Sequence, residues 1–111
     1  MSARWETWAW LAQRASAAVL ALCVAVHLAT VIVAVRGGLT AADILGRTRG
    51  SVSWGAFYGV FVLAVAIHAP LGVRTIAAEW LGWRGRAANI VVALFGVALA
   101  VLGARAIVAV T

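Results

Sequence analysis

The chain contains two histidines, His27 and His68, and each lies well inside a long apolar run. An ionisable side chain in such surroundings is costly without a partner, so its position is a functional candidate by default. Imidazole is a standard axial ligand of haem iron. Two histidines in such positions favour a haem site over two structural hydrogen bonds between helices.

The helical period groups other residues with each histidine, because positions separated by three, four, seven or eleven residues share one face of a helix. The stripe through His27 contains Ser16, Leu20 and Cys23. The stripe through His68 contains Phe57, Phe61, Ala64, Gly72, Thr75 and Glu79. Small residues such as Gly72 leave room for a flat macrocycle beside the imidazole.

The spacing also predicts how deep the two imidazoles lie. His27 is eleven residues after Ser16, and His68 is eleven residues before Glu79. At about 1.5 Å per residue, both imidazoles would lie roughly 16 Å from the same end of the two helices. We therefore expect them at similar depth.

Three charged residues, Arg14, Arg74 and Glu79, are expected near that same membrane face. Arginine can bind haem propionates or a headgroup, and a carboxylate can exchange the protons that quinone reduction requires. Arg74 and Glu79 are five residues apart and do not share a helix face. The alternative for these residues is snorkelling to the interface with a surface ion pair.

Composition predicts the elements that position these residues. The chain is 66% hydrophobic and 11% charged, with apolar runs at 15–35, 52–78 and 88–110. A bilayer core needs about 20 such residues as helix, and no alternating pattern indicates a barrel. We predict an all-α integral membrane protein in which residues 1–111 form one domain. Its three transmembrane helices are expected at 12–36, 52–80 and 87–110.

The segments outside these spans are short. Residues 1–13 read as an amphipathic lead-in rich in tryptophan, and Thr40 with Asp43 indicates a short capped helix in the first loop. The lone Cys23 excludes a disulfide or a cysteine cluster within the chain.

The net charge of +6 comes entirely from arginine on the basic side, because the chain has no lysine. The arginines lie at helix ends and in loops, which argues against nucleic acid and favours lipid headgroups or an acidic partner. Five lie on the side of the N-terminus and second loop, and four on the other, which favours a cytoplasmic N-terminus. The five on the side of the N-terminus are Arg4, Arg14, Arg74, Arg84 and Arg86. The four on the other side are Arg36, Arg47, Arg49 and Arg105.

The segment HAPLGVRTIAAEW, from His68 to Trp80, resembles the second-helix motif of the cytochrome b membrane anchors of succinate dehydrogenase and fumarate reductase. That motif has a His, a Gly four residues later, often an Arg two beyond, and an acidic residue eleven after the His. The segment QRASAAVLALCVAVHL resembles the family's first helix. The matching positions are His68, Gly72, Arg74 and Glu79, then Arg14 and Ser16, with His27 at the place of a further His in two-haem members.

The resemblance implies that His68 is an axial ligand of haem b. It implies a quinone site near Arg14, Ser16, Glu79 and Trp80. The chain would be one anchor subunit of a larger helical bundle in the bacterial inner membrane, with a flavoprotein, an iron–sulfur subunit and a second anchor as partners. It would carry electrons in the tricarboxylic acid cycle. Three departures affect the quinone side: Trp10 replaces a Ser, Glu79 the usual Asp, and Trp80 a Tyr.

Two other functions stay open, a small proton-relay transporter or channel subunit and a structural subunit without a cofactor. This chain has no dinucleotide motif or cluster cysteines, so it holds no dehydrogenase site. For His27, three alternatives remain: it shares one haem with His68, serves a second haem with a partner chain, or binds nothing. The resemblance fits either succinate oxidation or fumarate reduction.

Overall fold

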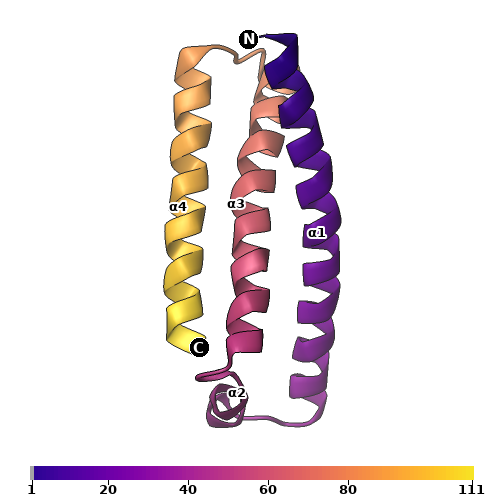
Figure 1. The fold of residues 1–111 in the computed structure, drawn as a ribbon, viewed down its shortest axis with the longest axis vertical. Helices are drawn as coiled ribbons and strands as arrows, with labels where there is room; N and C mark the ends of the chain where they lie inside the picture. Colours follow the sequence, from indigo (N-terminus) through magenta and orange to yellow (C-terminus); the bar gives the residue numbers. More distant parts are fainter. Residues whose placement is uncertain (1) are drawn as a thin grey trace.

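Three long helices and one short helix make up the computed structural model, which describes residues 2–111 and contains no strand in that range. The long helices α1 (Ala3–Arg36), α3 (Val52–Leu81) and α4 (Arg86–Val110) run side by side, with α3 in the middle (Figure 1). Each is long and apolar enough to cross a membrane. The predicted all-α fold with three membrane-spanning helices is confirmed.

The first helix begins nine residues before the predicted position 12. Ser2 caps it by accepting a hydrogen bond from the Trp5 backbone N–H at 3.2 Å, and Glu6 lies in its first turn. No Gly or Pro follows before the apolar run, so nothing interrupts propagation from this cap. Residues 3–13 therefore belong to α1 and do not form the separate lead-in that was expected. The ends of α3 and α4 lie within one residue of the predicted ranges.

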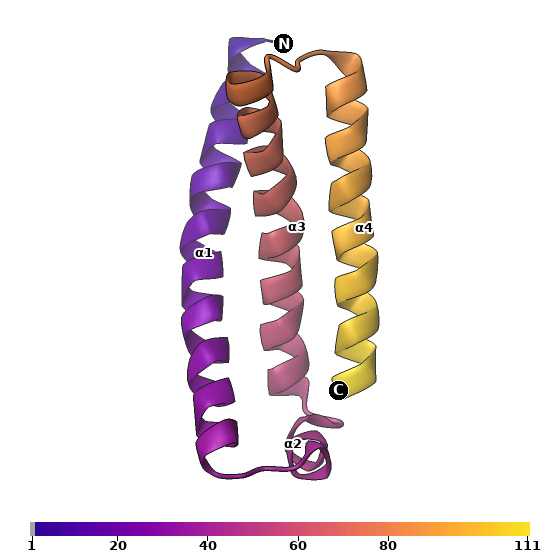
Figure 2. The same cartoon turned by 180° about the vertical axis from the view of Figure 1, so that it is seen from behind.

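The short helix α2 (Ala41–Thr48) fills the first loop. The Thr40 hydroxyl accepts from the Asp43 N–H at 3.1 Å, and the Asp43 carboxylate accepts from the Thr40 N–H at 2.8 Å, which is a capping box. Both views show α2 nearly end-on, so it lies across the end of the bundle that is distant from the N-terminus (Figures 1 and 2). The capped helix start predicted at Thr40 is confirmed.

Two glycines let α4 approach α3 closely. A Cβ atom on Gly96 would lie 2.7 Å from Cγ of Pro70, and one on Gly103 would lie 2.5 Å from Cγ1 of Val62. Both distances are too short for a real Cβ contact. Small residues commonly mediate such packing in membranes, where lipid offers no hydrophobic drive for helices to associate.

The contact between α1 and α3 uses the two stripes predicted from the helical period. Ser16 and Cys23 of α1 are buried, as is Ala64 of α3. A Cβ on Gly72 would lie 3.3 Å from the amide nitrogen of Gln13. The two stripes therefore face each other.

Little of the apolar surface is buried within this one chain. Between residues 2 and 111 the buried apolar residues are all small or medium in size, namely Cys23, Ala64, Ala77, Ala88 and Val92. Large apolar side chains point outward along all three long helices. This distribution is the one expected where lipid and neighbouring helices surround the chain.

Candidate functional site

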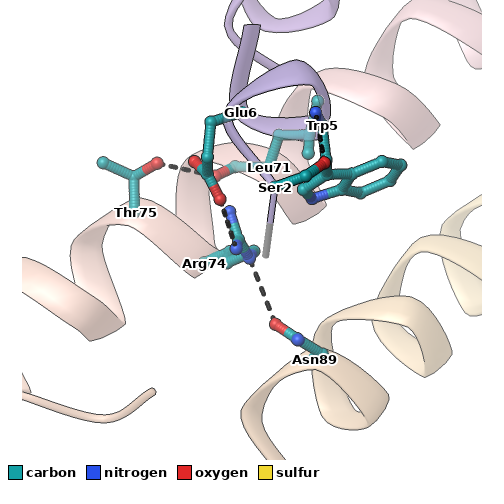
Figure 3. A network of polar contacts seen from close by, with 7 residues as sticks. All are labelled: Ser2, Trp5, Glu6, Leu71, Arg74, Thr75 and Asn89. Carbon is teal, nitrogen blue, oxygen red and sulfur yellow. Dashed lines mark hydrogen bonds and ion pairs between the residues drawn. The ribbon is translucent and has the colours of Figure 1, made fainter. Parts of the chain in front are cut away.

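Arg74 joins the three long helices near the N-terminus (Figure 3). Its Nη2 donates to the Glu6 carboxylate of α1 at 3.2 Å, and its Nε donates to the Asn89 side-chain oxygen of α4 at 3.1 Å. Its side chain is 25% exposed. The spacing in the sequence indicated that Arg74 does not pair with Glu79, but it did not identify Glu6 and Asn89 as partners of Arg74. The sequence did contain a signal for these partners, because Glu6 and Asn89 are polar residues near the N-terminal ends of their helices.

His68 lies in the middle of α3 and is half-buried. It shares a helix face with Ala64 and Gly72, which lie against α1. Its Nδ1 atom is buried without a hydrogen-bond partner. Across the contact, the side-chain oxygen of Gln13 is also buried without a partner. Within residues 2–111, neither histidine side chain makes a hydrogen bond to another helix. The described residues therefore offer no hydrogen-bond partner for the alternative in which both histidines only bond across helices.

His27 is exposed and lies against the aromatic residues of the first half of α3. Its ring centroid is 6.1 Å from that of Tyr58 and 5.7 Å from that of Phe61, with both rings edge-on. Phe61 precedes His68 by seven residues, which is roughly 10 Å along a helix at about 1.5 Å per residue. The expectation of equal depth for the two imidazoles is therefore wrong.

The error arose from the register assumed between α1 and α3. The spacing predicted that Ser16 lies level with Glu79, but Ser16 lines the same small pocket as Ala64 and Ile67, about three turns deeper. Both imidazoles would have to reach the same iron atom to hold one haem. The structure thus gives no geometric support to a haem shared by His27 and His68 of the same chain.

The residues expected near a quinone do not meet in one place within this chain. Arg14 is exposed, with its guanidinium carbon 5.4 Å from the ring centroid of Trp10. Ser16 is buried, and its hydroxyl donates to the Gln13 carbonyl at 3.1 Å. Trp80 is 81% exposed.

Glu79 is exposed and lines a cavity of about 460 Å³ at the end of the bundle that holds the N-terminus. Glu6, Arg74, Arg84 and Asn89 share this cavity. It contains two carboxylates and two guanidiniums. Such a mixture of acidic and basic groups can exchange protons with water.

Ligands for a bare metal ion are not gathered in this chain. No group of three or more His, Cys, Asp or Glu side chains comes together within the described residues. The donor set, which consists of isolated imidazoles in apolar helices, instead suits an iron whose equatorial ligands belong to a macrocycle.

Comparison with known proteins assigns the chain to a family. Residues 1–105 match the family described as the succinate dehydrogenase/fumarate reductase transmembrane subunit. Neither the curated proteins nor the solved structures give a match. The family and the three apolar helices together make this a multi-pass membrane protein of a succinate:quinone oxidoreductase complex. Because the match covers nearly the whole chain, the protein belongs to the family of succinate dehydrogenase/fumarate reductase transmembrane subunits.

Proposed function

We propose that this anchor subunit binds haem b through His68 and forms part of a quinone site, so that electrons pass between the iron–sulfur subunit and quinone. The observation that carries the proposal is the buried, unpartnered Nδ1 atom of His68 in a membrane-spanning helix. A ligating imidazole uses one nitrogen for the metal and donates from the other to a neighbouring acceptor. Haem ligation would give the His68 imidazole a polar partner, which no described residue of this chain provides.

The surroundings of His68 support the proposal. Gly72, one turn away on the same face, has no side chain, and Ala64 on the other side is small. The unpartnered oxygen of Gln13 lies on the facing helix near Gly72. Two unsatisfied polar atoms on facing helices are expensive in lipid, which suggests that a further group or chain completes this contact.

The chemistry of the bound haem would be one-electron transfer. The residues of this chain hold and orient it: His68 ligates the iron, and Arg14 supplies positive charge for the propionates or the quinone. Arg74 divides its donors between Glu6 and Asn89, so we assign it the role of fixing the three helices around the site.

Quinone reduction consumes protons as well as electrons. Glu79, exposed in the cavity at the membrane face, is the proposed proton donor, and Ser16 and Trp80 are further candidates for contact with the headgroup. These residues lie on different faces of the chain. We therefore propose that the iron–sulfur subunit and a second membrane anchor complete the quinone site and supply the second axial ligand of the haem.

His27 is proposed to serve a second haem only together with ligands from a partner chain. We also propose that the complex lies in the bacterial cytoplasmic membrane with the N-terminus of this subunit on the cytoplasmic side. A proton-relay transporter is disfavoured because the sequence between Asn89 and Arg105 of α4 contains no polar side chain.

The visible spectrum of the purified complex tests the proposal. The whole complex is expressed with its flavoprotein and iron–sulfur subunits, and the reduced-minus-oxidised b-type band is measured. His68→Ala should abolish the band of the haem it ligates, whereas Cys23→Ala, a small change in the same helix contact, should keep it. A haem-free wild-type complex with full quinone reductase activity would overturn the proposal.

A further inference from the structure

We propose that the groove between α1, α2 and α3 binds one phospholipid with an anionic headgroup, with its phosphate at Arg47. This groove lies at the opposite end of the bundle from the Arg74 network. The proposal depends on the membrane location of the chain, and it is an alternative to the second haem proposed at His27, because His27 lines the groove.

The groove has a cavity volume of about 360 Å³. The second half of α1 forms one wall, the start of α3 forms another, and α2 crosses its end. Arg47 of α2 lies at this end, and most of the remaining lining is apolar, including Val33, Ala34 and Ile44. One cation above an apolar trough matches the division of a phospholipid into phosphate and acyl chain.

A second groove extends the first one deeper into the bundle. Its volume is about 510 Å³, and the two grooves share His27 and Tyr58. Beyond these two residues the second groove is lined by apolar side chains of α3 and α4, among them Val62, Leu99 and Leu102. A long acyl chain can therefore continue past His27 without meeting another polar side chain.

The charge of this end selects an anionic headgroup. Arg36, Arg47 and Arg49 are all exposed here. Asp43 is the one acidic residue of the loop, and its carboxylate is already bound to the Thr40 N–H in the capping box. Arginines near a membrane surface attract anionic lipids. The cavity at the other end differs, because there two carboxylates balance two guanidiniums.

A neutral quinone would bring no anion to Arg47, and the neighbouring Asp43 carboxylate is already bound to the Thr40 N–H. The phospholipid satisfies both parts of the groove, since its phosphate pairs with the guanidinium and its chain covers the apolar walls.

The test measures phospholipid bound to the intact complex. The complex is purified in mild detergent, and anionic phospholipid per complex is quantified by mass spectrometry of the organic extract. Arg47→Gln should lower retention about fivefold, the effect expected for one arginine at the surface. Arg49→Gln removes the same charge from a residue that does not line the groove and should change retention little.

A second variant tests the groove without changing charge. Ala34→Phe fills the trough and should also reduce bound phospholipid, while haem content and subunit composition report that the complex is intact. Equal phospholipid in all three variants and the wild type would overturn the proposal. Loss of quinone or of a partner subunit in Arg47→Gln, with phospholipid unchanged, would assign the groove to that occupant instead.

Discussion

The Arg74 guanidinium of α3 donates to the Glu6 carboxylate of α1 at 3.2 Å, although the two residues are 68 positions apart. This contact helps to set the register of α1 against α3. It places Gln13 beside Gly72 and His27 beside Phe61. The separation of His27 and His68 along the bundle follows from that register, so the polar contacts at one end contribute to where each imidazole lies.

Removing Arg74 should weaken the contacts among all three long helices. Arg74→Ala deletes hydrogen bonds to both Glu6 and Asn89, each worth about 1 kcal/mol in net stability. Glu6→Gln should cost less, about 0.5 kcal/mol, because this carboxylate is 54% exposed and water screens its charge. Thermal unfolding of the purified complex measures both effects.

Arg84→Gln is the matched control, since Arg84 lines the same cavity and lies in the loop beyond α3. We expect its effect to stay within about 0.5 kcal/mol, as for most surface substitutions. A destabilisation equal to that of Arg74→Ala would mean that general charge, and not the network, holds this end together.

The contact between Gly103 and Val62 should show compensation. Gly103→Ala introduces a methyl group where Cγ1 of Val62 lies 2.5 Å away, and overpacking of this kind costs about 1–3 kcal/mol. Val62→Ala should restore much of the loss, because it removes the clashing methyl groups. Thermal stability of the single and double variants gives the coupling energy.

Gly59→Ala provides the control on α3, where an added Cβ would have no neighbour within 4 Å. It should be neutral or slightly stabilising, since alanine is the better helix former. If the double variant is no more stable than Gly103→Ala alone, the close approach of α3 and α4 at this point is not what limits stability.

The sequence predicted the three spanning helices because length and hydropathy alone determine them. The 3.6-residue period also grouped residues that lie in the contact between α1 and α3, namely Ser16 with Cys23 and Ala64 with Gly72. The axial register could not be predicted, since it depends on pairings such as Glu6 with Arg74 between distant residues. The dispersed positions of Arg14, Glu79 and Trp80 could not be predicted either, because the proposed site is shared among subunits and would leave no complete pattern in one chain.

The capping box of α2 should make this loop helix sensitive to acid. Hydrogen bonds from the Thr40 backbone N–H and hydroxyl, with a smaller contribution from Arg47, lower the pKa of Asp43 below its usual value of about 3.8. A carboxyl whose pKa is lower in the folded state stabilises that state above its unfolded pKa. This contribution is lost as the pH falls through the folded pKa, below about pH 4.

Hydrogen exchange of the α2 amides between about pH 3 and pH 6 measures the effect, after correction for the intrinsic pH dependence of exchange. The wild type should lose protection in α2 as the pH falls below about 4, whereas Asp43→Ala should be poorly protected throughout. The amides in the middle of α3 serve as the internal control. Equal protection of α2 in both proteins at neutral pH would contradict a stabilising role for the box.

The depths of the two histidines predict different effects on haem. Because His27 lies beside Tyr58 and Phe61, roughly 10 Å along the bundle from His68, the two should not be ligands of the same iron. His27→Ala should therefore leave the haem that depends on His68 in place. It should reduce the haem count per anchor only if a second haem is present.

Haem stoichiometry, measured with the reduced spectrum of each variant, decides between these outcomes. Phe61→Leu is the control for packing around His27, since it removes one of the edge-on rings and keeps the imidazole. If His27→Ala and His68→Ala each abolish one and the same b-type band while Phe61→Leu does not, the two imidazoles share an iron. The register seen between α1 and α3 would then differ from that of the assembled complex, and the Glu6–Arg74 contact would have to break during assembly.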